Sequence, residues 1–95
     1  RRIRQINQQV EDLAFKDVHG RVSSTLFQLL ETEEEISGQT LTRLRMTHQD
    51  LANMVGSSRE TVTRALNRLQ NEGIIAISHQ QIQILDRDYL SDSVI

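Results

Sequence analysis

Three charged residues with the chemistry to read nucleic-acid bases stand close together in the chain: Arg59, Glu60 and Arg64. A guanidinium can donate two hydrogen bonds to O6 and N7 of guanine, and a carboxylate can accept one from N4 of cytosine. On a helix that buries Val62 and Leu66, Glu60 and Arg64 lie on the opposite side, with Arg59 at the flank of the first turn. The alternative is an exposed pair of Glu60 and Arg64 that only stabilises a surface helix, by about 0.2–0.5 kcal/mol.

The segment around this trio predicts a helix-turn-helix. Thr47 is followed three residues later by an aspartate, a capping arrangement that begins a short helix, and Gly56 ends it. Ser57 is followed three residues later by a glutamate, which predicts a second capping box. We expect the longer helix that follows to cover residues 58–72.

A wing is predicted directly after this helix, because the apolar period changes from 3.6 to 2 beyond Gly73. Residues 74–77 form an apolar, β-branched run, and Ile82 and Ile84 alternate with glutamines. Two strands with a short polar loop make a hairpin, which we place at residues 74–85. The predicted fold class is therefore mainly α with a small β-hairpin, a winged helix-turn-helix.

The first fourteen residues carry a narrow apolar stripe typical of a coiled coil. Two heptads do not form a stable helix alone, so residues 1–16 are predicted to be the C-terminal end of a dimerisation helix. Residues 17–95 are predicted to be the winged domain, with Asp17 as the N-cap of its first helix. The alternative is an amphipathic helix that packs on its own domain. The candidate dimerisation residues are Ile3, Ile6, Val10 and Leu13.

The segments before and after the motif give weaker predictions. Glutamates from Glu31 to Glu35 crowd the end of the helix predicted after Asp17, where they oppose its dipole, so fraying is expected. Leu41 to Met46 predicts a short strand, and Asp86 to Ile95 shows no clear pattern.

Composition excludes several classes of protein. The chain has 95 residues, enough for one domain, and it has no cysteine and no proline. Disulfide scaffolds, thiolate metal sites and cysteine nucleophiles are therefore excluded, and no apolar run is long enough to predict a membrane span. His19, His48 and His79 are too far apart in sequence to predict a metal site. No nucleophile elbow or phosphate loop is present, so we expect no enzyme and no cofactor within these residues.

The charge distribution points to an anionic partner more clearly than the total charge does. The net charge is −2 and the pI about 5.9, which weighs against nucleic acid. Residues 40–70, however, carry a net charge of +3 between acidic flanks, and every cation there is an arginine. Chance asymmetry of a solvated surface is the alternative explanation.

The string from Gly56 to Arg64, Gly-Ser-Ser-Arg-Glu-Thr-Val-Thr-Arg, resembles the DNA-binding domain of the Crp/Fnr family of transcription regulators. Residues 11–22 are similar to the segment that joins the family's dimerisation helix to this domain. Residues 47–52 resemble its first motif helix, and residues 71–75 its entry into the wing. The resemblance covers most of the chain.

This resemblance implies a function and a set of contacts. The trio would read a TGTGA-like half-site in the major groove of double-stranded DNA, and the family binds near-palindromes as a homodimer. A cation often stands at the positions of His48 and Gln80 in close relatives, so contacts there are expected to be weaker. The implied phosphate contacts are Thr47, His48, Gln49, Ser58 and Thr61.

The resemblance also implies partners outside this chain. A sensory domain would precede the dimerisation helix, so the effector is unknown, with a cyclic nucleotide as one candidate. RNA polymerase is a candidate partner, although Glu35 to Arg43 does not closely match the loop with which some relatives touch it. The chain begins at Arg1 without a methionine or a signal segment, so we expect a piece of a longer cytoplasmic protein. The competing functional hypothesis is a winged-helix module that binds protein through its acidic flanks and isoleucine-rich wing.

Overall fold

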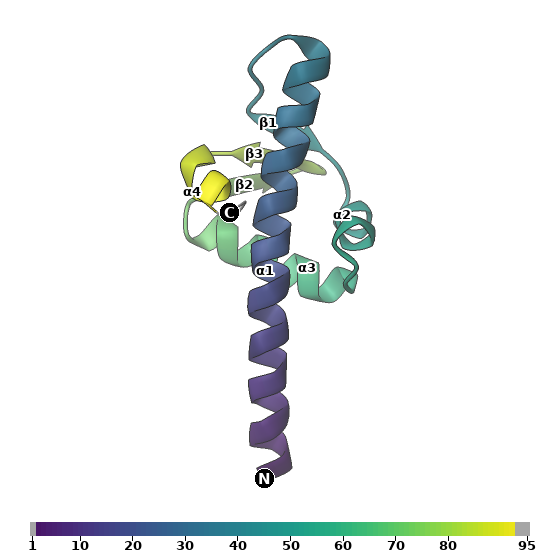
Figure 1. Ribbon diagram of the computed structural model, residues 1–95, viewed down its shortest axis with the longest axis vertical. Coiled ribbons are helices and arrows are strands. Elements are labelled where there is room, and N and C mark those ends of the chain that lie inside the picture. The colour runs from purple at the N-terminus through teal and green to yellow at the C-terminus, as the bar shows by residue number, and fades with distance from the viewer. Residues whose placement is uncertain (1, 93–95) are drawn as a thin grey trace.

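The fold is a helix-turn-helix and a small sheet packed around one long helix (Figure 1). The computed structural model describes the backbone of residues 2–92 and the side chains of residues 16–92. In Figure 1, α2 lies on one side of α1, α4 lies on the other, and α3 crosses α1. The predicted winged helix-turn-helix is confirmed. Its elements are α1 (Arg2–Ser37), β1 (Arg43–Arg45), α2 (His48–Val55), α3 (Arg59–Asn71), β2 (Ile75–Ser78), β3 (Gln81–Ile84) and α4 (Arg87–Asp92).

Helix α1 is continuous, so the prediction that Asp17 begins a new helix was wrong. The Asp17 carboxylate instead lies on the helix surface, 2.9 Å from Nη2 of Arg21, one turn along. No proline interrupts the helix, and an i,i+4 ion pair is compatible with a helix interior. The boundary between residues 1–16 and 17–95 stays a prediction. The dimerisation candidates Ile3, Ile6, Val10 and Leu13 lie outside the residues whose side chains the structure describes.

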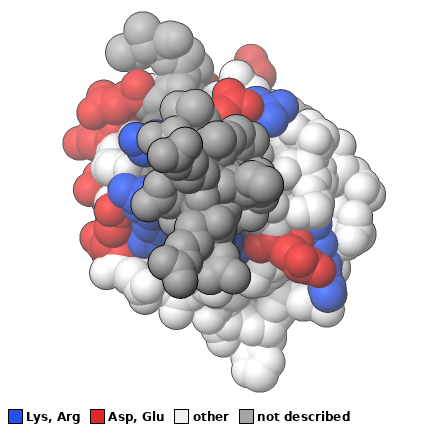
Figure 2. Space-filling model, turned by 90° about the horizontal axis from the view of Figure 1, so that it is seen from below, with Lys and Arg blue, Asp and Glu red and all other residues white. Residues whose placement is uncertain are grey.

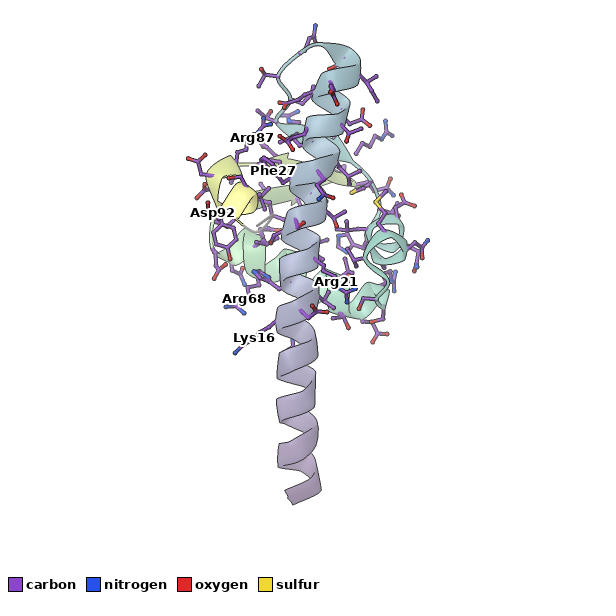
Figure 3. All side chains as sticks on the ribbon, viewed as in Figure 1. Lys16, Arg21, Phe27, Arg68, Arg87 and Asp92 are labelled. Atoms are coloured by element: carbon purple, nitrogen blue, oxygen red, sulfur yellow. The ribbon has the colours of Figure 1, made fainter. Side chains whose placement is uncertain are left out.

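The glutamate-rich end of α1 continues as helix to Ser37, contrary to the expected fraying. Glu34 accepts two hydrogen bonds from the guanidinium of Arg87, at 2.6 and 2.7 Å, and one from the backbone N–H of Leu41 at 2.7 Å. These bonds lower the pKa of Glu34 to about 2. Figure 3 shows Arg87 beside Phe27 of α1, and its guanidinium carbon lies 5.5 Å from the centre of that ring. The pair therefore joins the end of α1 to α4.

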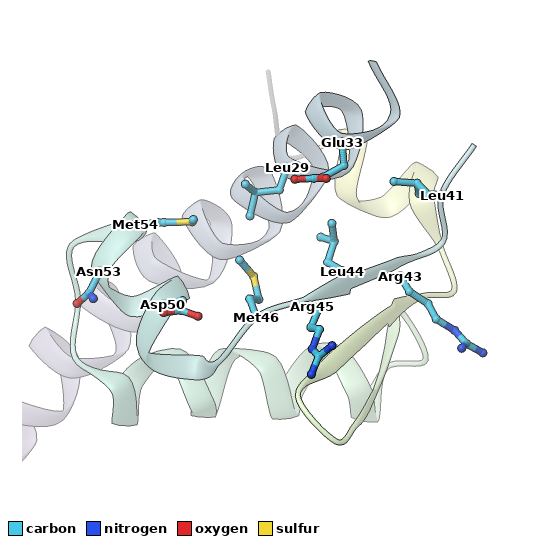
Figure 4. Close-up of a pocket in the computed structure, with 10 residues that line it drawn as sticks. All are labelled: Leu29, Glu33, Leu41, Arg43, Leu44, Arg45, Met46, Asp50, Asn53 and Met54. Atoms are coloured by element: carbon cyan, nitrogen blue, oxygen red, sulfur yellow. The ribbon is translucent and has the colours of Figure 1, made fainter. Parts of the chain in front are cut away.

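The wing is a three-stranded antiparallel sheet in the order β1-β3-β2. The strand predicted within Leu41 to Met46 is confirmed as β1, and it extends the predicted hairpin because Leu44 pairs with Ile82. Leu44 is buried, whereas Arg43 and Arg45 are exposed on the other side of the strand, as strand alternation requires (Figure 4).

The core lies between α1, the helix-turn-helix and the sheet. The unassigned tail forms α4, whose Leu90 is fully buried in this core. The hydroxyl of Tyr89, also in α4, lies 3.2 Å from Nε2 of His19. Burial lowers the pKa of His19, and the positive charge of Arg68 lowers it further, while Glu72 opposes the shift. Within the described part of the chain, no helix has the length and apolarity to cross a membrane.

Candidate nucleic-acid interface

Helix α2 begins and ends as its sequence predicts. The Thr47 hydroxyl accepts a hydrogen bond from the backbone N–H of Asp50 at 3.0 Å, and the Asp50 carboxylate accepts one from the backbone N–H of Thr47 at 3.1 Å. This reciprocal capping box confirms the predicted start. Gly56 ends the helix with φ at 72°, a left-handed conformation that favours glycine.

Helix α3 begins one residue later than the capping prediction placed it. Its N-cap is Ser58, whose hydroxyl accepts a hydrogen bond from the backbone N–H of Thr61 at 3.2 Å. The predicted box between Ser57 and Glu60 was therefore wrong. Both adjacent serines are suitable N-cap residues, and the structure selects Ser58 although only Ser57 has a glutamate three positions later. Glu60 is consequently exposed instead of bonded back to the cap.

The two faces of α3 separate apolar and polar residues as predicted. Its inner face is fully buried. The outer face shares a shallow surface groove with the start of α2, which we call the α3 groove. The predicted trio of Arg59, Glu60 and Arg64 is exposed and lines this groove together. The remaining lining residues are His48, Thr63 and Asn67.

A second groove, which we call the wing groove, lies between the start of α2 and the sheet. His48 and Arg59 line both grooves, so the two are adjacent. The wing contributes Gln80, whose backbone carbonyl accepts a hydrogen bond from the N–H of Met46 at 3.0 Å. Of the predicted phosphate-binding residues, Thr47, His48 and Gln49 line the wing groove. Ser58 and Thr61 line neither groove, and their hydroxyls lie 2.9 Å apart at the start of α3.

A hydrogen bond between the two motif helices was not predicted from the sequence. Nδ1 of His48, the first residue of α2, lies 2.8 Å from the hydroxyl of Thr63 on α3. The two residues are fifteen positions apart, and no local pattern signals their contact. The bond fixes the start of α2 against the outer face of α3, next to the predicted trio.

Charged side chains of both signs lie on the face of the molecule seen along α1 (Figure 2). Figure 2, seen from the N-terminal end of α1, shows acidic and basic side chains in mixed groups on that face. A further pocket, between α1, β1 and α2, is lined by apolar and polar residues in equal number (Figure 4). Its charged lining residues are Glu33, Asp50, Arg43 and Arg45, so two guanidinium groups balance two carboxylates. The described residues contain no group of three metal-ligating side chains placed to hold an ion.

The fold and these grooves define a winged helix-turn-helix domain whose second helix exposes a polar N-terminal half. The family model of the Crp-like helix-turn-helix domain matches residues 20–93. The chain belongs to this family of DNA-binding transcription regulators, as the resemblance of residues 56–64 predicts.

Known relatives agree with this assignment. The chain is 36% identical over 84 residues to the cAMP-activated global transcriptional regulator CRP of Pasteurella multocida, covering 88% of the chain and 40% of that protein. It is 37% identical over 95 residues to the CRP-like cAMP-activated global transcriptional regulator of Mycobacterium tuberculosis, covering 96% and 41%. The crystal structure of the Thermus thermophilus catabolite activator protein superimposes with a TM-score of 0.81 at 27% identity, covering 99% and 41%. The chain therefore spans about two fifths of these relatives. Their names describe regulators, which agrees with the prediction that the chain is not an enzyme.

Proposed function

We propose that the chain binds double-stranded DNA sequence-specifically, with α3 in the major groove of a TGTGA-like half-site. Arg59 and Arg64 donate bidentate hydrogen bonds to guanines, and Glu60 accepts from cytosine. The observation that carries the proposal is that these three side chains are exposed together in the α3 groove, at the N-terminal half of the second motif helix. That half is the part of a recognition helix that reads bases.

The phosphate backbone is held at the two capped helix starts. Thr47, His48 and Gln49 surround the start of α2, and Ser58 and Thr61 surround the start of α3. Helix N-termini favour anions because their first N–H groups lack partners within the helix. These contacts set the position of α3 on the duplex, while the trio supplies the sequence preference.

The complete protein acts as a cytoplasmic homodimer on a near-palindrome. The N-terminal part of α1 extends away from the other elements (Figure 1), where it can pair with a second copy through Ile3, Ile6, Val10 and Leu13. The relatives are cAMP-activated by name and more than twice as long as this chain, so a cyclic nucleotide is the first effector to test in the full-length protein. RNA polymerase is a further candidate partner.

Fluorescence anisotropy with a labelled duplex containing a TGTGA half-site tests the reading mechanism. Replacement of Arg59 or Arg64 by alanine is expected to weaken specific binding by about 1–3 kcal/mol and to relax preference at one base pair. Arg43→Ala is the matched control, because Arg43 is an exposed arginine on β1 that lines neither groove. Unchanged specific affinity in both recognition-helix variants would refute the mechanism.

A further inference from the structure

Asn67 is a polar side chain of the α3 groove that lies outside the predicted trio. It is exposed on α3 and lines the groove together with Glu60 and Arg64. Among the residues that the structure describes, its side-chain amide has no hydrogen-bond partner. Thr63 also lines the groove, but its hydroxyl already contacts His48 at 2.8 Å. Asn67 is therefore open to a contact from outside the molecule.

The position of Asn67 on the helix aligns it with the predicted base-reading residues. Seven residues separate it from Glu60, which on an α-helix places the two within about 20° of the same direction. It lies three residues beyond Arg64, or about 4.5 Å along the axis. This step is slightly longer than the base-pair spacing of about 3.4 Å. With α3 docked in the major groove as proposed, this step would place Asn67 opposite the base pair next to the one read by Arg64, on the side away from Arg59.

The chemistry of the side chain indicates which base it favours. An asparagine amide carries a donor and an acceptor, and it can bind N7 and N6 of adenine at the same time. No other base offers this pair of groups in the same arrangement on its major-groove edge. A phosphate contact by the same amide would carry no base preference, so discrimination between duplexes separates the two roles.

We propose that Asn67 is a fourth specificity-determining residue, which reads the base pair next to that of Arg64 and favours adenine. This inference rests on the proposed function, since it requires α3 to lie in the major groove. The proposal extends the set of base-reading residues from the first turn and a half of α3 into the next turn.

The test measures binding to a panel of duplexes derived from a TGTGA half-site. In this panel the base pair read by Arg64 and each of its two neighbours are replaced, one at a time, by all four base pairs. Asn67→Ala is expected to reduce discrimination at one of these positions by about fivefold or more. Asn67→Asp removes the donor and is expected to shift the preference there from adenine towards cytosine. Asn71→Ala is the matched control, an exposed asparagine one turn further along α3 that lines neither groove.

The possible results separate this inference from the proposed function. Loss of discrimination in Asn67→Ala, with Asn71→Ala unchanged and both variants equally helical by circular dichroism, supports it. The inference is overturned if Asn67→Ala keeps the wild-type base preference, or if Asn71→Ala loses as much discrimination as Asn67→Ala does. The proposed function still stands in that case, provided that Arg64→Ala relaxes the preference at its own base pair. If neither the wild-type chain nor any variant distinguishes the duplexes, the proposed function fails and the inference fails with it.

Discussion

The tip of the wing provides a direct test of where the phosphate backbone runs. Gln80 is exposed, lines the wing groove beside His48 and Arg59, and is uncharged. Gln80→Lys places a cation there without adding backbone strain, because glutamine already occupies the left-handed region with φ at 65°. If a phosphate lies against the wing, the new ammonium neutralises it and releases a counterion.

The size of the effect follows from the one phosphate that the new cation would neutralise. Each neutralised phosphate steepens the slope of log affinity against log salt by about 0.9. The slope of Gln80→Lys should therefore be about 0.9 more negative than that of wild type for each half-site. Between about 50 and about 200 mM salt, the affinity of the variant should fall about 3.5-fold further than that of wild type.

Anisotropy titrations on a duplex with one TGTGA half-site, at four or more salt concentrations, measure these slopes. Gln28→Lys is the control, because it makes the same charge change at an exposed position of α1 that lines neither groove. It should leave the slope unchanged. An equal steepening in both variants would show that net charge alone is responsible, and an unchanged slope in Gln80→Lys would place the wing away from the phosphates. A wild-type slope near zero would favour the protein-binding module.

Three further predictions concern stability. Because folding lowers the pKa of His19 below 6.5, its contribution is present above that pH and is lost as the pH falls through the lowered value. Urea denaturation at pH 8 and pH 5 should show this loss, and His19→Gln should reduce the pH dependence. Folding also lowers the pKa of Glu34 from 4.5 to about 2, so stability from its pair with Arg87 is present above 4.5 and is lost as the pH falls towards 2. Acid titration by circular dichroism should therefore unfold Arg87→Met at a higher pH than wild type, and coincident curves would contradict the role of the pair. Gln80→Gly relieves the left-handed backbone at φ 65° and should raise stability by up to about 1 kcal/mol in thermal denaturation, whereas Gln81→Gly in the neighbouring strand should lower it.

The helix-turn-helix could be predicted from the sequence because its signals are local. The inner face of α3, including Val62 and Leu66, follows from the helical period, and the capping box at Thr47 spans only four residues. Even here the start of α3 was predicted one residue too early, because both adjacent serines suit an N-cap and only Ser57 has a glutamate three positions later. The packing of Thr61 against Ser58 decides between them.

The missed features all depend on residues that are distant in the sequence or on a choice between compatible local states. Asp17 suits a helix start, yet it equally tolerates a helix interior when Arg21 stands one turn later. The glutamate run looks unfavourable for a helix end until Arg87, 53 residues away, binds Glu34. No residue close to Glu34 in the sequence indicates that Arg87 is its partner.

The amino-acid sequence by itself determined the helix-turn-helix, the polar outer face of α3 and the strand alternation of the wing, since each depends on spacings within a few residues. Only the tertiary structure decided that β1 completes the sheet, that α4 closes the core and that His48 binds Thr63 beside Arg59. The reason is that such contacts join segments whose separation along the chain carries no periodic signal, and they form only when the core brings those segments together.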